Sequence, residues 1–168
     1  EKRRKAIELT ATLMFSAMRN NDNIGLFIFT DKVEQYIPAR KGRRHVLKLI
    51  SSLVKHQPES KKTNLNNSLA FISNVVKKRS VLFIISDFYS ENFMQPLSIL
   101  RNRHDVIGIK ISDNREKEMP DVGLIQLEDE ETGEQILVDT SDKEFRKNYA
   151  TVMSKQTKKT DTLFKRHK

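Results

Sequence analysis

Short uninterrupted apolar runs alternate along this chain with apolar stripes of helical period. In the most pronounced run, residues 81–85 are all apolar and are followed directly by Ser86 and Asp87. Such a run favours a strand buried on both faces, as in a parallel sheet covered by helices. Asp87 would then follow the carboxyl end of the strand, where open α/β sheets bind ligands. Alternatively, Asp87 only caps the next helix or closes a turn.

Further strands are predicted from the same kind of pattern. Residues 24–30 and 106–111 are apolar runs, and residues 33–39 alternate, with Pro38 in a position that suits an edge strand. Asp31 and Lys32 form the tight turn between residues 24–30 and 33–39, which are therefore expected to pair antiparallel. Residues 122–127 and 135–138 flank an acidic turn and predict a β-hairpin.

Helices are predicted between these strands. The first covers residues 2–20 and carries a wide apolar face. A second follows the basic run at residues 40–45, with Val46, Leu49/Ile50 and Leu53/Val54 facing inward. A third opens after Thr63 or Asn64, either of which can act as its cap. Two more are expected over residues 91–103, capped by Ser90, and after the capping box at residues 141–144, with Phe145, Tyr149 and Val152 inward.

The order of these elements predicts an α/β fold. Buried strands that alternate with helices indicate an open, mostly parallel, doubly wound sheet with helices on both faces. One antiparallel edge strand and an added β-hairpin complete the predicted architecture. The first helix has no strand before it, so we expect this α/β unit to begin one element late.

Composition limits the classes of protein to consider. A chain of 168 residues is long enough for one domain that buries about two thirds of its unfolded surface. There are no cysteines, which excludes disulfides and thiolate metal sites and agrees with the cytoplasmic location that we expect. No apolar run approaches the roughly 18 residues of a membrane span. Histidines 45, 56, 104 and 167 have no neighbours at metal-ligand spacing.

The positive charge is concentrated in the first half of the chain. The net charge is +9; residues 1–80 carry 17 Lys and Arg against 6 Asp and Glu (+11), and residues 81–168 carry 14 against 16 (−2). A basic half could bind nucleic acid, anionic lipid or an acidic protein. Because the basic residues are scattered and not interleaved with aromatics, we favour solvated helix faces and expect no specific nucleic-acid partner. The basic run at residues 40–45 could hold phosphate, but we favour the start of a helix.

Several short motifs, in order and spacing, resemble one bacterial family along essentially the whole chain. The chain is identified as a member of the domain of unknown function 58 family, whose members are similar to von Willebrand factor A domains. The motifs are Gly25 to Asp31, Arg43-Arg44-His45-Val46-Leu47, Thr63-Asn64-Leu65, Ile85-Ser86-Asp87-Phe88, Arg103-His104-Asp105-Val106, Pro120-Asp121-Val122-Gly123, Glu131-Thr132-Gly133-Glu134 and Val138-Asp139-Thr140-Ser141. Residues 1–168 are accordingly expected to form a single domain of this type.

The resemblance implies a divalent-cation site at the carboxyl rim of the sheet, the metal ion-dependent adhesion site. Its motif consists of an Asp-x-Ser-x-Ser loop, a Thr and a later Asp; Thr63 and Asp87 match the last two parts. Mg²⁺ or Mn²⁺ would suit such oxygen ligands. The Asp-x-Ser-x-Ser loop does not occur in this chain. We therefore expect the first, central strand and a last strand to be missing, and weak or no metal binding by the chain alone.

The resemblance also implies a function. We expect a non-enzymatic protein–protein interaction module that works with a MoxR-type AAA+ ATPase in a chaperone-like or assembly role. Phe88, Tyr89 and Asp31 are candidates for the partner face, although the two aromatics could equally be buried and Asp31 could serve only the turn. Exposed strand edges could also support a homodimer. The alternative is a magnesium-dependent phosphoryl or nucleic-acid hydrolase that uses Asp87, Asp31 and Asp113.

Overall fold

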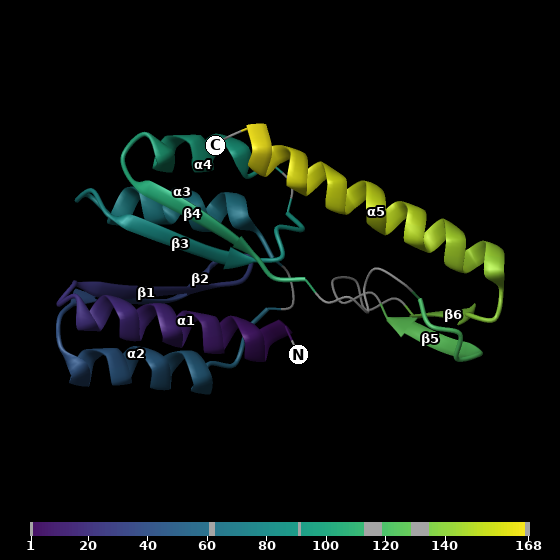
Figure 1. Cartoon of the computed structure of the whole chain (residues 1–168), viewed down its shortest axis with the longest axis horizontal. Coiled ribbons are helices and arrows are strands. Elements are labelled where there is room, and N and C mark those ends of the chain that lie inside the picture. Colours follow the sequence, from purple (N-terminus) through teal and green to yellow (C-terminus); the bar gives the residue numbers. More distant parts are fainter. Residues whose placement is uncertain (1, 61–62, 91, 113–118, 129–134, 167–168) are drawn as a thin grey trace. The chain divides into compact units, whose positions relative to one another are not determined.

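The computed structural model describes residues 2–60, 63–90, 92–112, 119–128 and 135–166. The chain forms two compact units, Glu1–Ile111 and Ser112–Lys168. In the first unit, helices and strands follow one another in the predicted order (Figure 1). Its elements are α1 (Lys2–Arg19), β1 (Ile24–Phe29), β2 (Val33–Arg40), α2 (Arg43–Lys55), α3 (Leu65–Val75), β3 (Val81–Ser86), α4 (Met94–Arg101) and β4 (Asp105–Lys110).

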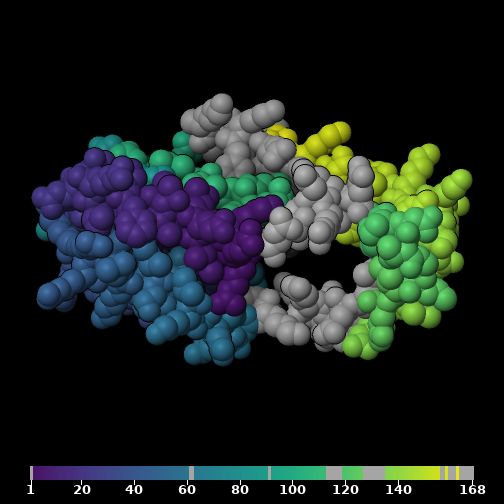
Figure 2. Space-filling model, turned by 60° about the horizontal axis from the view of Figure 1, so that its bottom comes forward, coloured from purple at the N-terminus to yellow at the C-terminus, as the bar shows by residue number. Residues whose placement is uncertain are grey.

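A hairpin and two helices form one part of the first unit. Strands β1 and β2 pair antiparallel, as predicted, and the rings of Phe27 and Tyr36 stack with centroids 4.4 Å apart. Helices α1 and α2 lie side by side (Figure 2). The core between these elements is apolar and consists of Met14, Leu26, Ile37, Val46 and Leu49. The apolar stripes of the two helices therefore face the hairpin, as their period requires.

The other part of the first unit consists of a parallel strand pair and two helices. Strands β3 and β4 run in register from Val81 opposite Asp105 to Ser86 opposite Lys110. Helices α3 and α4 pack on each other, and α4 contacts β4. Asn64 caps α3, because its side chain accepts a hydrogen bond from the backbone N–H of Asn67. Leu65, Leu69 and Leu100 are fully buried or nearly so between these helices.

Strands β1 and β3 end at the same rim. The backbone N–H of Asn64 donates to the carbonyl of Thr30, directly after β1. The backbone N–H of the next residue, Leu65, donates to the hydroxyl of Ser90, shortly after β3. One loop thus holds both carboxyl ends, and β1 and β3 run in the same direction.

The described residues show an α/β structure but do not show the single open sheet that was predicted. They contain three separate two-stranded sheets, of which only β3–β4 is parallel, since β1 and β3 are not hydrogen-bonded to each other. The expected burial of β3 on both faces is also wrong: Ile84 is buried, but Val81 and Phe83 are 54% and 45% exposed. Val81 and Phe83 share one face of the strand by the period of two. An apolar run indicates that burial of both strand faces would be favourable. It does not show whether another element of the chain covers each face.

Four local predictions also differ from the structure. Helix α4 begins at Met94 without a side-chain cap, and the hydroxyl of Ser90 is instead used by Leu65. Asp142 rather than Ser141 accepts hydrogen bonds from the N–H groups of Glu144 and Phe145 at the start of α5. Val54 and Val152, expected inward, are exposed. Only at α5 does a neighbouring residue, Asp142, take over the expected role, yet all of these helices are present.

The second unit contains a β-hairpin and a long helix. Strands β5 (Leu124–Glu128) and β6 (Gln135–Asp139) pair antiparallel, as predicted, and α5 spans Lys143–Arg166. The acidic turn between the strands lies outside the described residues. The hydroxyl of Thr140, which is fully buried, donates to the carbonyl of Gly123 and accepts from the N–H of Val122. Among the described residues, no helix has the length and apolar character that a membrane-spanning helix needs.

Gly25 allows β1 and β2 to approach closely. An added Cβ would lie 3.1 Å from both Ala39 N and Ile37 O. Because these are backbone atoms, we expect Gly25→Ala to lower the free energy of unfolding by about 1–3 kcal/mol in a urea titration. The exposed Asn23→Ala is the control and should change it by less than about 0.5 kcal/mol. Equal values for the two variants would contradict the close contact.

Candidate functional site at the strand rim

A cavity of about 360 Å³ lies within the first unit, between β1, β3 and the first turns of α1. At its rim it is lined by Thr63 and by Ser86 and Asp87, which follow the apolar run of β3. Lys2 and Arg3 line it from α1. The structure therefore brings together Thr63 and Asp87, the two residues that the sequence matched to a metal motif.

The carboxylate of Asp87 serves both the turn and the cavity. Its Oδ1 accepts hydrogen bonds from the N–H of Tyr89, at 3.2 Å, and from the hydroxyl of Ser86, at 3.4 Å. Its Oδ2 lies 3.8 Å from Nζ of Lys2. The side chain is 35% exposed, so this ion pair is screened and contributes little to stability. One oxygen fixes the local turn, and the other faces a cation at the rim.

The backbone after Asp87 is strained. Phe88 has a φ of 58°, which is uncommon for a residue with a bulky side chain. The hydroxyl of Ser86 accepts its backbone N–H, and its ring is buried against that of Phe93, with centroids 5.9 Å apart. Of the two roles considered for Phe88, partner contact and burial, the structure therefore shows burial. Strain of this kind is often found where a functional side chain must be held in place.

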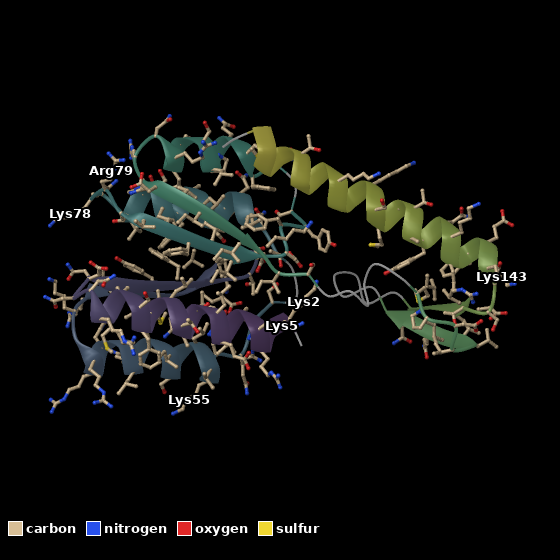
Figure 3. The ribbon with its side chains drawn as sticks, in the orientation of Figure 1. Lys2, Lys5, Lys55, Lys78, Arg79 and Lys143 are labelled. Atoms are coloured by element: carbon tan, nitrogen blue, oxygen red, sulfur yellow. The ribbon has the colours of Figure 1, made fainter. Side chains whose placement is uncertain are left out.

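Cations surround the rim. Nζ of Lys2 lies 5.5 Å from the ring centroid of Tyr89, and Nζ of Lys110 lies 6.0 Å from it, both within cation–π range. Figure 3 shows Lys2 and Lys5 at the end of α1 nearest the carboxyl ends of β3 and β4, whereas Lys78 and Arg79 lie at the opposite end of these strands. Lys2, Arg3 and Lys110 therefore place positive charge near the carboxylate of Asp87 at this rim.

The hydroxyl of Thr63 is not needed to cap a helix. The cap of α3 is Asn64, the second of the two residues predicted for that role. The hydrogen bond from Asn64 N–H to the Thr30 carbonyl, 3.0 Å long, fixes the chain next to Thr63. Thr63 is exposed and lines the cavity. It can therefore offer its oxygen to a ligand.

A buried carboxylate that the sequence did not reveal supports this rim. The side chain of Glu34 is only 1% exposed. Its oxygens lie 2.6 Å from the hydroxyl of Thr30, 2.5 Å from Nε2 of His56 and 2.9 Å from the backbone N–H of Glu59. Burial raises the pKa of Glu34, but the hydrogen bonds from Thr30, His56 and Glu59 outweigh it, and the pKa lies below its ordinary value. The alternation of residues 33–39 placed Glu34 opposite the apolar face, so only its partners from distant segments explain its burial.

Asp31 belongs to the β1–β2 turn and is not among the residues that line the cavity. Its Oδ1 lies 3.2 Å from the hydroxyl of Thr30, whose proton is shared with the closer Glu34. A hydrogen bond from the side chain of Ser60 is the main cause that lowers the pKa of Asp31. Next to it, Nζ of Lys32 lies 2.8 Å from Glu59 Oε2. These contacts fasten the turn to residues 56–60 and use Asp31 structurally.

The described residues do not form a complete metal site. They contain no group of three or more Asp, Glu or His side chains that could hold a metal ion. The rim offers one carboxylate, of Asp87, with the hydroxyls of Thr63 and Ser86, whereas Mg²⁺ prefers six oxygen ligands. Of the three aspartates of the hydrolase alternative, Asp87 lines the cavity, Asp31 does not, and Asp113 lies outside the described residues.

Known proteins resemble this chain over most of its length. Residues 1–159 match the family described as "Protein of unknown function DUF58". The chain is 31% identical over 137 residues to "Uncharacterized protein Mb1516" of Mycobacterium bovis and "Uncharacterized protein Rv1480" of Mycobacterium tuberculosis. Each match covers 79% of this chain and 43% of the relative, so the chain spans less than half the length of these relatives. "Uncharacterized protein MAV169" of Mycobacterium avium is 32% identical over 100 residues, 58% of this chain and 59% of that protein. No solved structure matches the chain.

Glu34 should make stability depend on pH. Because its pKa is lowered by folding, its contribution is present above the ordinary value of 4.5 and is lost as the pH falls through the lower folded value. We expect Glu34→Gln to reduce the free energy of unfolding by about 1–3 kcal/mol at pH 7, and by less as the pH falls below that ordinary value. Urea titrations across this range measure the difference. The control is Glu8→Gln, whose side chain is 63% exposed. A constant difference at all pH values would refute this role for the Glu34 carboxylate.

Proposed function

Since the chain belongs to the DUF58 family, we propose that it is a non-enzymatic module that binds a protein partner at the rim around Thr63 and Asp87. The proposal includes the finer fold assignment, in which the strand pairs β1–β2 and β3–β4 belong to one open sheet of the von Willebrand factor A type. The shared direction of β1 and β3 supports this assignment. Ligands bind at the carboxyl ends of strands in such sheets, which is where Asp87 lies.

The geometry of Asp87 is the observation that carries the proposal. Its Oδ1 is fixed by Tyr89 and Ser86, and its Oδ2 faces the cavity beside Lys2. A carboxylate that needed only to close a turn would require neither the strained backbone of Phe88 nor a cavity in front of it. The site therefore has the features of a surface that holds a charged group in a defined place.

The charge of the rim indicates an acidic partner. Lys2 and Lys110 flank Tyr89, and Arg3 lines the same cavity as Lys2. A bound Mg²⁺ or Mn²⁺ would add positive charge that attracts a partner's carboxylate. Thr63 and Asp87 could supply part of its ligands, and further oxygen donors would have to come from outside the described residues. We propose a MoxR-type AAA+ ATPase as the partner class, which rests on the family resemblance.

Charge reversal at the rim tests the proposal. We expect Lys2→Glu to weaken binding of the chain to a MoxR-type AAA+ ATPase at least about tenfold, because it places a negative charge beside Asp87 where an acidic group should dock. Biolayer interferometry at fixed ionic strength measures the affinity. Lys78→Glu makes the same change in net charge at the opposite end of β3 (Figure 3) and should change it less than about twofold.

Two outcomes would contradict the proposal. If both variants weaken binding equally, the partner responds to net charge and not to the rim. If neither the chain nor its variants bind, this partner class is wrong. Circular dichroism of each variant confirms that the helices are retained, so that loss of binding is not loss of folding.

A further inference from the structure

The fold gathers four basic segments of the first unit at the edge opposite the rim. Arg40 lies opposite Ile24 at the start of β1, and the chain passes directly from Arg40 into α2. Asp105 lies opposite Val81, so the segments that lead into β3 and β4 are also neighbours. Because β1 and β3 run in the same direction, the starts of these strands share one edge. We call this surface the basic edge and define it as residues 19–23, 40–44, 77–80 and 101–105.

The basic edge carries almost the whole net charge of the chain. It contains ten Lys and Arg against two Asp, a net charge of +8, whereas the whole chain carries +9. All ten cations are exposed. In the described part of the chain only one of them forms an ion pair, in which Arg79 lies 3.0 Å from Asp105. The ten cations are Arg19, Arg40, Lys41, Arg43, Arg44, Lys77, Lys78, Arg79, Arg101 and Arg103.

Helix stability does not account for all of these cations. Arg19 and Arg101 end α1 and α4, where positive charge is favourable because it faces the negative end of the helix dipole. Arg43 and Arg44, in contrast, begin α2, where positive charge opposes the dipole. The first turn of α2 contains no acidic residue, and Gly42 offers no side chain as a cap. An anion bound at this edge would offset the unfavourable placement.

From the charge and composition of the basic edge we infer that it binds double-stranded nucleic acid through the phosphate backbone. Seven of the ten cations are Arg, whose planar guanidinium group can donate two hydrogen bonds to one phosphate. Four exposed asparagines of the edge, at positions 20, 21, 23 and 102, add amide donors of the kind that also contact phosphates. The basic edge lies away from the rim, so this inference does not depend on the proposed protein partner.

The composition of the basic edge favours this partner over two others. Apart from Gly42, every residue of the four segments is polar or charged. Sites that bind membrane surfaces commonly add apolar side chains that enter the bilayer, and sites for single-stranded nucleic acid add aromatic rings that stack on bases. The four segments contain neither. Phosphate contacts carry no sequence information, so the binding should be independent of nucleotide sequence.

Fluorescence anisotropy with a labelled DNA duplex of about 24 base pairs tests the inference. We expect a dissociation constant below about 100 µM at physiological salt, in the range of nonspecific binding. If about five phosphates are contacted, the affinity should fall about 500-fold between about 50 and about 200 mM NaCl. Two duplexes of unrelated sequence should differ less than about threefold, and a single strand of the same length should bind at least about threefold more weakly.

Two charge-matched double variants locate the binding surface. Arg44→Glu/Lys78→Glu changes one cation beside α2 and one beside β3, and should weaken duplex binding at least about 20-fold at about 0.1 M salt. Lys5→Glu/Lys55→Glu makes the same change in net charge in the first turn of α1 and the last turn of α2, away from the basic edge (Figure 3). It should weaken binding less than about threefold, because salt screens charges beyond about 10 Å. Circular dichroism checks that both variants remain folded.

Each of four other outcomes overturns the inference. If the duplex does not bind even at about 50 mM salt, the basic edge is not a nucleic-acid surface. If both double variants weaken binding equally, the duplex responds to net charge and not to this edge. If the single strand binds more tightly than the duplex, the partner is single-stranded. If the chain cosediments with vesicles of phosphatidylserine and phosphatidylcholine but does not bind the duplex, the partner is a membrane surface.

Discussion

Two adjacent backbone amides, those of Asn64 and Leu65, determine how the parts of the first unit relate. They donate to Thr30 and Ser90, the residues that follow β1 and β3. These hydrogen bonds bring both strand ends to one loop and leave Thr63 beside Asp87 at the cavity. They matter because β1 and β3 have no hydrogen bonds to each other; the contact of Phe27 in β1 with Phe71 in α3 also joins the two parts. The candidate site therefore depends on this short loop.

The loop is supported by a polar cluster that is costly to bury. Glu34 is nearly inaccessible to solvent and is stabilised only because three donors surround it. One of these donors is the hydroxyl of Thr30, whose carbonyl holds Asn64. The side chain of Arg3 donates to the carbonyl of His56, so α1 is connected to the same cluster. Thr30 therefore connects the buried carboxylate of Glu34 with the loop that carries Thr63.

The sequence predicted local structure well and its assembly less well. Helical period, strand alternation and the Asn64 cap follow from interactions within a few residues, and these elements are present. The burial of Glu34 could not be predicted, because its partners His56 and Glu59 are more than twenty residues away and carry no spacing signal. That Thr63 and Asp87 line the same cavity was expected only from a family resemblance. The exposure of Phe83 shows the main limit of the sequence prediction. An apolar run indicates that burial of the strand is favourable, but it does not show which other element, if any, covers the strand.

The exposed face of β3 and the charged rim belong to the same cavity. Phe83 is 45% exposed and lines the cavity together with Thr63 and Asp87. Covering this apolar surface is a change that the hydrophobic effect favours. A ligand that carries an apolar group next to its charged group could therefore use both parts of the cavity, because Phe83 would contact the apolar group while the charged group lies at the rim.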